Sequence, residues 1–475
     1  MDAFEKDGTL TDENIRGIFS GAGDFNIRVL RCCDVTLYAY AIDGLTSGSV
    51  ISEYIIKPIA EQLHGNTVQE LYSRALEGAV VNSVAKECAD AQDAALKLVN
   101  GFCVVLFPEA GATAFEAKTP EKRSISGPEM ENIPKGPRDG FVETVRTNTS
   151  LVRRHLRTPD LRIYETQVGQ RSITNVSVLW IEGVTDSNYV HRMCRRLLQI
   201  DVDGFLTPAA VEEYITGSRF TAFPLLQYTQ RTDRFCAGLL EGRVGVLVDG
   251  IPVGYLAPVD IGYLMDSAED YSRDFVTASV IRVLRYGALL LDLMLPAIYI
   301  AMTMFHWDLL PSALEQVIAQ GRQNVPFAPM WEILMLLLAF ELLQETGVHL
   351  PQNIGQSVSI IGGIVVGTVG VEAGLVSSLA LITVSISGVC GFVLPNRDFA
   401  DAIRVWRFAL ALLASAFGLF GVGIGLMALL LRLAFLKSLG TAYLVPFAPG
   451  LLRRRLKTYK FRAKRLYPLD RRKQR

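Results

Sequence analysis

Apolar residues are distributed unevenly along this chain. Before residue 285 they occur in short runs rich in β-branched residues, each followed by a polar turn and a helical stretch, which is the pattern of small α/β units. After residue 285 they form long runs with few interruptions. The pattern predicts an α+β front half, made of a duplicated small α/β subdomain, followed by an all-α polytopic membrane domain.

The duplication is visible as an internal repeat. Residues 37–55 resemble residues 176–194, and residues 100–107 resemble residues 241–248 at nearly the same offset. In each copy a strand-like run meets an acid-glycine turn and then a helix. The two copies are expected at about residues 20–118 and 160–260.

A segment with five prolines and many charges separates the two copies. Proline-rich, charged connections are typical of linkers, and this is the interpretation we favour. The alternative is that the Arg153-Arg154 pair docks on an acidic surface. The predicted organisation is a first α/β subdomain (1–118), a Pro-rich linker (119–159), a second α/β subdomain (160–280), a helical transmembrane domain (281–436) and a basic cytoplasmic tail (437–475).

Charge is also divided unevenly. The formal net charge is −1, yet residues 452–475 hold twelve of the 47 basic residues and a single acid, so residues 1–451 carry 35 basic and 47 acidic groups. Basic segments flanking a membrane domain favour the cytoplasmic side, and the first residues lack the basic and apolar regions of an export signal. Both ends are therefore expected in the cytoplasm, with an even number of membrane crossings.

Five apolar stretches approach or exceed the roughly 20 residues that cross a bilayer. They are 286–305, 330–351, 354–376, 377–395 and 405–436. The second is interrupted by three glutamates, and the last is too long for one upright span, so it tilts, breaks near Gly421 to Gly425 or extends past the bilayer. Six crossings result if the second stretch crosses and the last one splits. Four result if the second lies at the interface, and we favour four.

The stretch 354–376 has two different faces at helical spacing. Glycines on one side suit close packing against a neighbouring helix, while hydroxyls, apolar residues and a carboxylate on the other suit a cation-selective pore. The candidate pore-lining residues are Ser357, Ile361, Val365, Thr368 and Glu372, and the candidate helix-packing residues are Gly363, Gly367, Gly370 and Gly374. The alternative is a tightly packed span that faces lipid, with Glu372 at the headgroups.

Patterns for catalysis or metal binding are not found in the sequence. The seven cysteines form no CxxC pair, the five histidines form no ligand cluster, and neither a phosphate-binding glycine loop nor a Ser/His/Asp order is present. The acid-glycine pairs are interpreted as turn formers. We therefore expect no enzymatic activity, no cofactor, no metal and no nucleic-acid partner.

Several long motifs resemble the A subunit of nutrient germinant receptors, the GerA spore-germination family. The motifs are "EGRVGVLVDG" (241–250), "SAEDYSRDF" (267–275), "LPAIYIAMTMFHWDLLP" (295–311), "VHLPQNIGQSVSIIGG" (348–363), "VEAGLVS" (371–377) and "LVPFAP" (444–449). They occur in one order, and with the front repeat the resemblance covers nearly the whole chain.

The resemblance implies a multi-pass subunit in the inner membrane of a bacterial spore, acting with a transporter-like B subunit and a lipoprotein C subunit. It further implies a homo-oligomer, a pentamer, that forms a ligand-gated channel for monovalent cations and triggers germination, with nutrient sensing in the B subunit. The alternative function is a non-conducting scaffold that assembles the receptor complex. The basic tail is expected to contact anionic membrane lipid.

Overall fold

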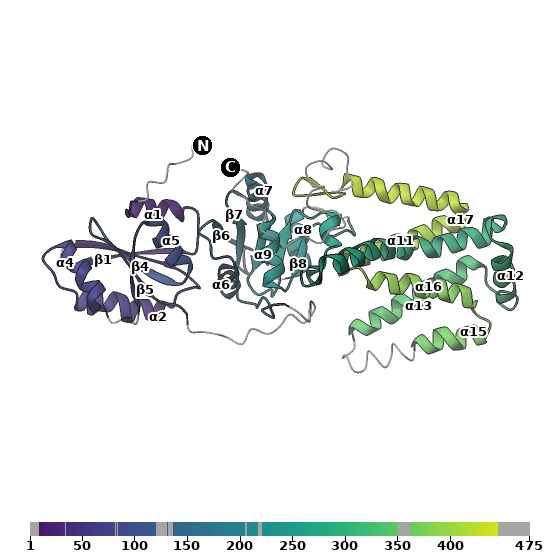
Figure 1. Ribbon diagram of the computed structural model, residues 1–475. Helices are drawn as coiled ribbons and strands as arrows, with labels where there is room; N and C mark the ends of the chain where they lie inside the picture. The colour runs from purple at the N-terminus through teal and green to yellow at the C-terminus, as the bar shows by residue number, and fades with distance from the viewer. Residues whose placement is uncertain are drawn as a thin grey trace. The chain divides into compact units, whose positions relative to one another are not determined.

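The computed structural model describes most of the chain, and the chain divides into two compact units (Figure 1). The described residues are 9–33, 35–80, 82, 84–119, 131, 136–204, 207–216, 221–349 and 362–444. The first unit comprises residues 1–219 and 226–258, and the second comprises residues 220–225 and 259–475.

The first unit contains two five-stranded antiparallel sheets with equivalent strand orders. One sheet has the order β1-β2-β4-β5-β3 and the other β6-β7-β9-β10-β8, so each strand of the first has a counterpart in the second, as expected for a duplicated fold. The strands are β1 (Phe25–Cys32), β2 (Val35–Ile42), β3 (Ala85–Cys88), β4 (Phe102–Phe107), β5 (Gly111–Glu116), β6 (Leu161–Val168), β7 (Thr174–Ile181), β8 (Gln227–Thr229), β9 (Val244–Val248) and β10 (Gly254–Ala257).

Helices cover both faces of the first sheet, which explains why its central strand is apolar throughout. Val104 and Leu106 of β4 pack on one face with α1 (Asp12–Ile18) and α5 (Ala91–Val99). Cys103, Val105 and Phe107 pack on the other face with α3 (Lys57–Glu61) and α4 (Val68–Arg74). A strand buried on both sides reads as a continuous apolar run rather than an alternating one. The helices of this unit are α1 (Asp12–Ile18), α2 (Gly48–Ile51), α3 (Lys57–Glu61), α4 (Val68–Arg74), α5 (Ala91–Val99), α6 (Val145–His155), α7 (Ser187–Leu198), α8 (Pro208–Thr216) and α9 (Thr232–Leu240).

Helix α6 lies inside the segment 119–159, which the sequence predicts as a linker. Its residue Arg153 is 1% exposed and donates from Nε and Nη2 to the carboxylate oxygens of Asp24, at 2.8 and 2.9 Å. Asp24 belongs to the first repeat and is also buried. This part of the segment is therefore a packed helix, held to the first repeat by a buried ion pair. Loss of either partner would leave a buried charge uncompensated, which is strongly destabilising.

Among its described residues the second unit is helical, with a short β-hairpin at residues 437–442. The elements are α10 (Ile261–Leu264), α11 (Phe275–Phe305), α12 (Ser312–Gly321), α13 (Pro329–His349), a π-helical turn (Val365–Val369), α15 (Gly370–Glu372), α16 (Ser378–Phe392), α17 (Arg397–Phe435), β11 (Lys437–Ser438) and β12 (Thr441–Ala442). Among the described residues, α11 and α17 are long and apolar enough to cross a membrane.

Helix α17 turns back on itself at Gly418. This residue has φ 62° and ψ −142°, a left-handed backbone conformation that interrupts the helix and favours glycine. A methyl group placed on Gly421 would lie 2.0 Å from the carbonyl oxygen of Leu413, so the two halves touch directly after the turn. The long apolar run is therefore a helical hairpin (Figure 1) whose turn lies three residues before the break expected at Gly421 to Gly425.

The helices of the second unit run back and forth between two ends. At one end Gly418 adjoins His306, Gly374 adjoins Asn324, and the backbone N–H of Ser377 donates to Glu332. At the opposite end the hairpin β11–β12 bonds to the chain that precedes α11: the N–H of Val259 donates to Ser438 Oγ, and the N–H of Ile261 donates to the carbonyl of Tyr443, both at 2.9 Å. The described helical segments thus make six passes between these ends, namely α11, α13, the segment 362–372, α16 and the two halves of α17. The entry and exit of the unit lie together (Figure 1).

Candidate functional site

A cluster of charged side chains lies among the apolar helices of the second unit. Asp292 of α11 is fully buried, and Arg407 of α17 is 2% exposed. Nη1 of Arg407 donates to Oδ1 of Asp292 at 2.7 Å, and the hydroxyl of Ser387 in α16 donates to the same oxygen at 3.0 Å. The carboxylate of Asp292 therefore connects three helices.

Arg404, one turn before Arg407, extends the cluster to α13. Its Nη1 donates to Oε1 of Glu341 at 2.7 Å, and its Nη2 bonds to Asp401. Nη2 of Arg407 lies 3.9 Å from Oε2 of the same Glu341. Glu341 is consequently within ion-pair range of both arginines.

The cluster is only partly satisfied by hydrogen bonds. Oδ2 of Asp292, Oε2 of Glu341 and Nε of Arg407 are buried and have no hydrogen-bond partner among the described residues. Leaving such a group unpaired in a protein interior costs about 1–3 kcal/mol, and more for a charged group. The cluster therefore leaves three buried polar atoms whose hydrogen-bonding capacity is unused among the described residues.

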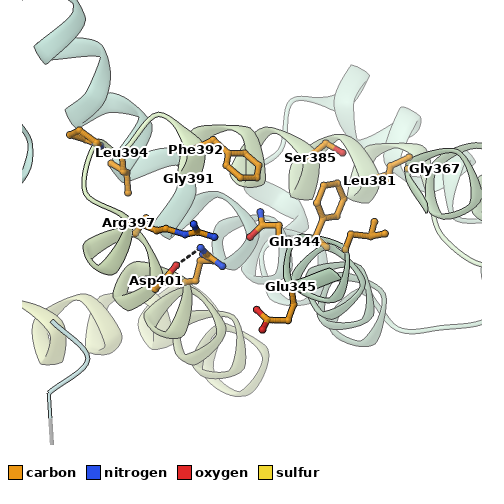
Figure 2. Close-up of a pocket in the computed structure, with 16 residues that line it drawn as sticks. Gln344, Glu345, Gly367, Leu381, Ser385, Gly391, Phe392, Leu394, Arg397 and Asp401 are labelled. Carbon is orange, nitrogen blue, oxygen red and sulfur yellow. Dashed lines mark hydrogen bonds and ion pairs between the residues drawn. The ribbon is translucent and has the colours of Figure 1, made fainter. Parts of the chain in front are cut away.

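A cavity of about 800 Å³ lies beside the cluster (Figure 2). Its walls combine apolar side chains with charged groups of α13 and α17. Gly391 also lines it, and a methyl group on Gly391 would lie 3.1 Å from Oδ2 of Asp292. The lining residues are Phe340, Leu343, Gln344, Glu345, Gly363, Gly367, Leu381, Ser385, Gly391, Phe392, Leu394, Pro395, Arg397, Ala400, Asp401 and Arg404. Two glycines of the predicted pore segment thus share a cavity with Arg404 of the charged cluster.

A second buried pair fixes the opposite end of the bundle. Glu332, in the first turn of α13, is fully buried and accepts a hydrogen bond from Nη1 of Arg322 at 2.7 Å. It also accepts the backbone N–H of Ser377, the residue that caps α16. This carboxylate connects the start of α13, the start of α16 and the loop after α12.

The candidate pore-lining residues are only partly within the described chain. Ser357 and Ile361 lie outside the described residues, and of Val365 the structure describes only the backbone, in the π-helical turn. Thr368 and Glu372 are both exposed in the isolated chain. Their assignment to a pore remains a prediction.

The four candidate packing glycines differ in their surroundings. Gly363 has open space where a side chain would stand, whereas a methyl group on Gly367 would contact Leu381 of α16 at 3.8 Å. Gly370 begins α15 and is half-buried. Gly374 follows α15, has φ +69° and adjoins Asn324, so a glycine at this position also suits the left-handed backbone of the turn. The packing role likewise remains a prediction.

The charged cluster could have been suspected from the sequence, but not assembled from it. Asp292, Glu341 and Arg407 stand out as isolated charges in or beside apolar stretches, and such charges are costly unless paired. Their partners come from four helices separated by up to 115 positions. Only the packing of those helices shows that Arg407 pairs with Asp292 and Arg404 with Glu341.

The acid-glycine pairs of the first unit act as turns. Gly44 has φ +83° and Gly250 has φ +82°, conformations that favour glycine. Asp249 accepts the backbone N–H of Val145 at 2.9 Å and so connects its turn to α6. Within the described part of the chain, no three His, Cys, Asp or Glu residues are grouped so as to hold a metal ion.

His155 at the end of α6 pairs with Asp139, and the pair should make the first unit sensitive to pH. The hydrogen bond to Asp139 raises the pKa of His155 above its usual 6.5, and the pKa of Asp139 is lowered by the same contact. A raised histidine pKa gives stability that is fully present below pH 6.5 and lost as the pH rises through the folded-state pKa. We expect His155→Gln to remove this loss, measured as the difference in denaturant midpoint between pH 6 and pH 8; an equal difference in wild type and variant would contradict the assignment.

Comparison with known proteins identifies the family. A model of the Bacillus/Clostridium GerA spore germination protein matches residues 13–474. The chain is 35% identical to an uncharacterized membrane protein, YfkQ, of Bacillus subtilis, over 92% of this chain and 85% of that protein, and 32% identical to the spore germination protein KA of the same organism, over 93% and 80%. A solved structure, the N-terminal domain of the A subunit of the Bacillus megaterium spore germinant receptor GerK3, aligns with a TM-score of 0.41 and 24% identity over 53% of this chain and 95% of that one. With a family model matching almost its full length, the chain belongs to the Bacillus/Clostridium GerA family of spore germination proteins.

Proposed function

We propose that this chain is the membrane subunit of a nutrient germinant receptor and that copies of it assemble, as a pentamer, into a ligand-gated channel for monovalent cations. Opening of the channel triggers germination. Family membership supports the role in germination, and a protein of this family is a receptor component rather than an enzyme. Channel activity and assembly into a pentamer go beyond what family membership supports.

The observation that carries the channel proposal is the two-sided segment 362–372. Gly362 adjoins Leu343 of α13 and Gly367 adjoins Leu381 of α16, so the segment packs against the subunit at these two positions, whereas Gly363 has open space beside it. Thr368 and Glu372 are exposed and free to face neighbouring copies. A ring of copies would surround an axis with hydroxyls and carboxylates, groups that favour cations.

The topology we propose has six crossings, with both chain ends in the cytoplasm of the spore and the helical unit in its inner membrane. Support comes from the six helical passes and from the joined entry and exit of the second unit. We favour six over four because Gly418 splits the last apolar run into two antiparallel halves. An accessibility assay with a membrane-impermeant thiol reagent checks the side on which the helical unit ends: a cysteine in place of the exposed Lys437 should react only from the cytoplasmic side.

The partners proposed are a transporter-like B subunit, which senses the nutrient, a lipoprotein C subunit and membrane lipid. The duplicated soluble unit is proposed to hold the ring together on the cytoplasmic side. A switch from mostly closed to mostly open takes about 5.5 kcal/mol of differential binding. So large a coupling suits a signal delivered through extensive contacts between subunits.

The competing function is a non-conducting scaffold for the B and C subunits. It would share the family, the membrane location and the partners, and it differs only in ion flux. Purified oligomers in liposomes distinguish the two: a channel releases trapped potassium under some condition, whereas a scaffold does so under none.

A bulky substitution in the pore segment should alter potassium release from spores. We expect Val365→Trp, or Ile361→Trp, to plug the pore or leave it permanently open, because a ring of indoles cannot fit where small side chains meet around an axis. The control is Ile386→Trp in α16, which changes a 44% exposed residue outside the pore segment. Unchanged potassium release in both pore variants would contradict the pore assignment.

A further inference from the structure

We propose that the charged cluster of the second unit is a two-position switch in which Arg407 exchanges Asp292 for Glu341, and that this exchange controls opening. The inference rests on the proposed channel function, whose regulation it describes. It assigns Arg407 as a positioning residue that acts through the helices it connects. The observations that carry it are the composition of the cluster, its unsatisfied atoms and the contact between α13 and the pore segment.

The cluster has more carboxylates than arginines. Three acids, Asp292, Glu341 and Asp401, face two bases, Arg404 and Arg407, within salt-bridge distances. Two arginines can therefore be paired with three carboxylates in more than one way. Such a network can be paired in more than one way, and discrete alternative pairings are a requirement for a switch.

In the arrangement described by the structure, Arg407 forms an ion pair with Asp292. It uses only Nη1 for this pair, at 2.7 Å, and leaves its Nε without a hydrogen-bond partner among the described residues. Arg404 divides its nitrogens between Glu341 and Asp401. We assign this arrangement to the closed channel.

The second arrangement requires only a small movement. Nη2 of Arg407 is 3.9 Å from Oε2 of Glu341, so an approach of about 1 Å gives a hydrogen bond of ordinary length. Oε2 of Glu341 is buried and lacks a partner among the described residues, so the new bond would satisfy it. Arg404 would keep Asp401, and Asp292 would keep Ser387.

The exchange would move the pore segment because α13 is packed against it. Glu341 lies in α13, and two residues later Leu343 contacts Gly362, where an added methyl group would lie 2.1 Å from Leu343 Cδ2. Leu343 therefore fills the space beside Gly362, and close-packed side chains of this kind pass a shift of one helix on to its neighbour. Drawing Glu341 toward Arg407 therefore displaces the start of the segment that carries Thr368 and Glu372.

Two isosteric substitutions test the switch through opposite effects. Asp292→Asn removes the charged partner of Arg407, so Arg407 should pair with Glu341 instead. Potassium release from spores without nutrient should then rise by roughly tenfold, the factor that corresponds to about 1.4 kcal/mol. Glu341→Gln removes the second partner and should leave release at the wild-type level. The double variant Asp292→Asn/Glu341→Gln has no second arrangement to enter, so its release should also return to the wild-type level.

A purely structural role predicts a different outcome. If the charges only hold the helices together, each substitution loosens the bundle and the double variant leaks at least as much as Asp292→Asn; that result would overturn the switch. Glu332→Gln is the matched control. Glu332 of α13 is as fully buried as Asp292 and is paired with Arg322 at 2.7 Å, but it lies outside the cluster. A leak from Glu332→Gln equal to that of Asp292→Asn would also overturn it.

A distance measurement separates failure of the switch from failure of the channel. Spin labels on Leu342 of α13 and Val389 of α16, exposed by 60% and 64%, report the separation of the two helices in the full-length protein. We expect Asp292→Asn to shift this distance and the double variant to restore it. A shift without ion flux would leave the switch standing and contradict the channel, whereas flux from the wild type without the shift would contradict the switch.

Discussion

Replacing Arg153 by methionine should lower the free energy of unfolding of the first unit by about 3–5 kcal/mol. Arg153 and Asp24 are each 1% exposed and joined by two hydrogen bonds of 2.8 and 2.9 Å. Methionine keeps much of the side-chain volume but leaves the carboxylate of Asp24 buried without its counter-ion. Denaturant unfolding of the full-length protein in detergent, followed for the first unit, measures the loss.

The neighbouring arginine provides the control for this experiment. Arg154 is only half-buried, and no carboxylate pairs with it among the described residues. Arg154→Met should change the free energy of unfolding by about 0.5 kcal/mol or less, as is usual for surface positions. Equal losses in the two variants would show that the Asp24 pair is not what fixes α6 to the first repeat.

Replacing Gly421 by alanine should prevent the last two helical passes from closing against each other. The added methyl group would lie 2.0 Å from the backbone oxygen of Leu413, and a backbone atom cannot move aside as a flexible side chain can. Overpacking of this kind costs about 1–3 kcal/mol or more. We expect a lower melting temperature for the full-length protein and a smaller amount of assembled receptor in the spore membrane.

Gly423→Ala is the matched comparison, two residues away on the same helix half. No atom lies within 4 Å of a methyl group placed at Gly423, so the helix should accept alanine without a shift. Alanine also has the higher helix propensity, so a small gain in stability is the expected result. If both variants lowered the melting temperature equally, the close contact between the two halves would be refuted.

The two buried pairs in the helical unit differ in what they contribute. Glu332 accepts from both Arg322 and the N–H of Ser377, which leaves neither of its oxygens unpaired, and it fixes the start of two helices. Asp292 has one oxygen satisfied twice and the other not at all. A fully satisfied pair favours one arrangement, whereas a partly satisfied one leaves room for a second.

Much of the architecture was predictable from residue patterns. The repeat indicated two copies of one α/β fold, and the matching strand orders of the two sheets agree with it. The apolar runs located the helical half, and isolated charges in those runs marked Asp292, Glu341 and Arg407 as unusual. These features are local, because periodicity and turn chemistry depend on neighbours in sequence.

The sequence could not decide which separated residues would meet. The segment around Arg153 looked like a linker because its prolines and charges are local signals, while Asp24, its partner, lies 129 positions away. The last apolar run was expected to break near Gly421 to Gly425, whereas the structure places the turn at Gly418, three residues earlier and beside His306.

By itself, then, the sequence determined the family and the division into an α/β half and a helical half, and it predicted two faces for the glycine-rich segment. Only the tertiary structure decided the six helical passes, the docking of α6 and the pairing of Arg404 and Arg407 across four helices. The physical reason is that the free energy of a buried charge depends on where its partner lies in space, and packing brings that partner from a distant part of the chain.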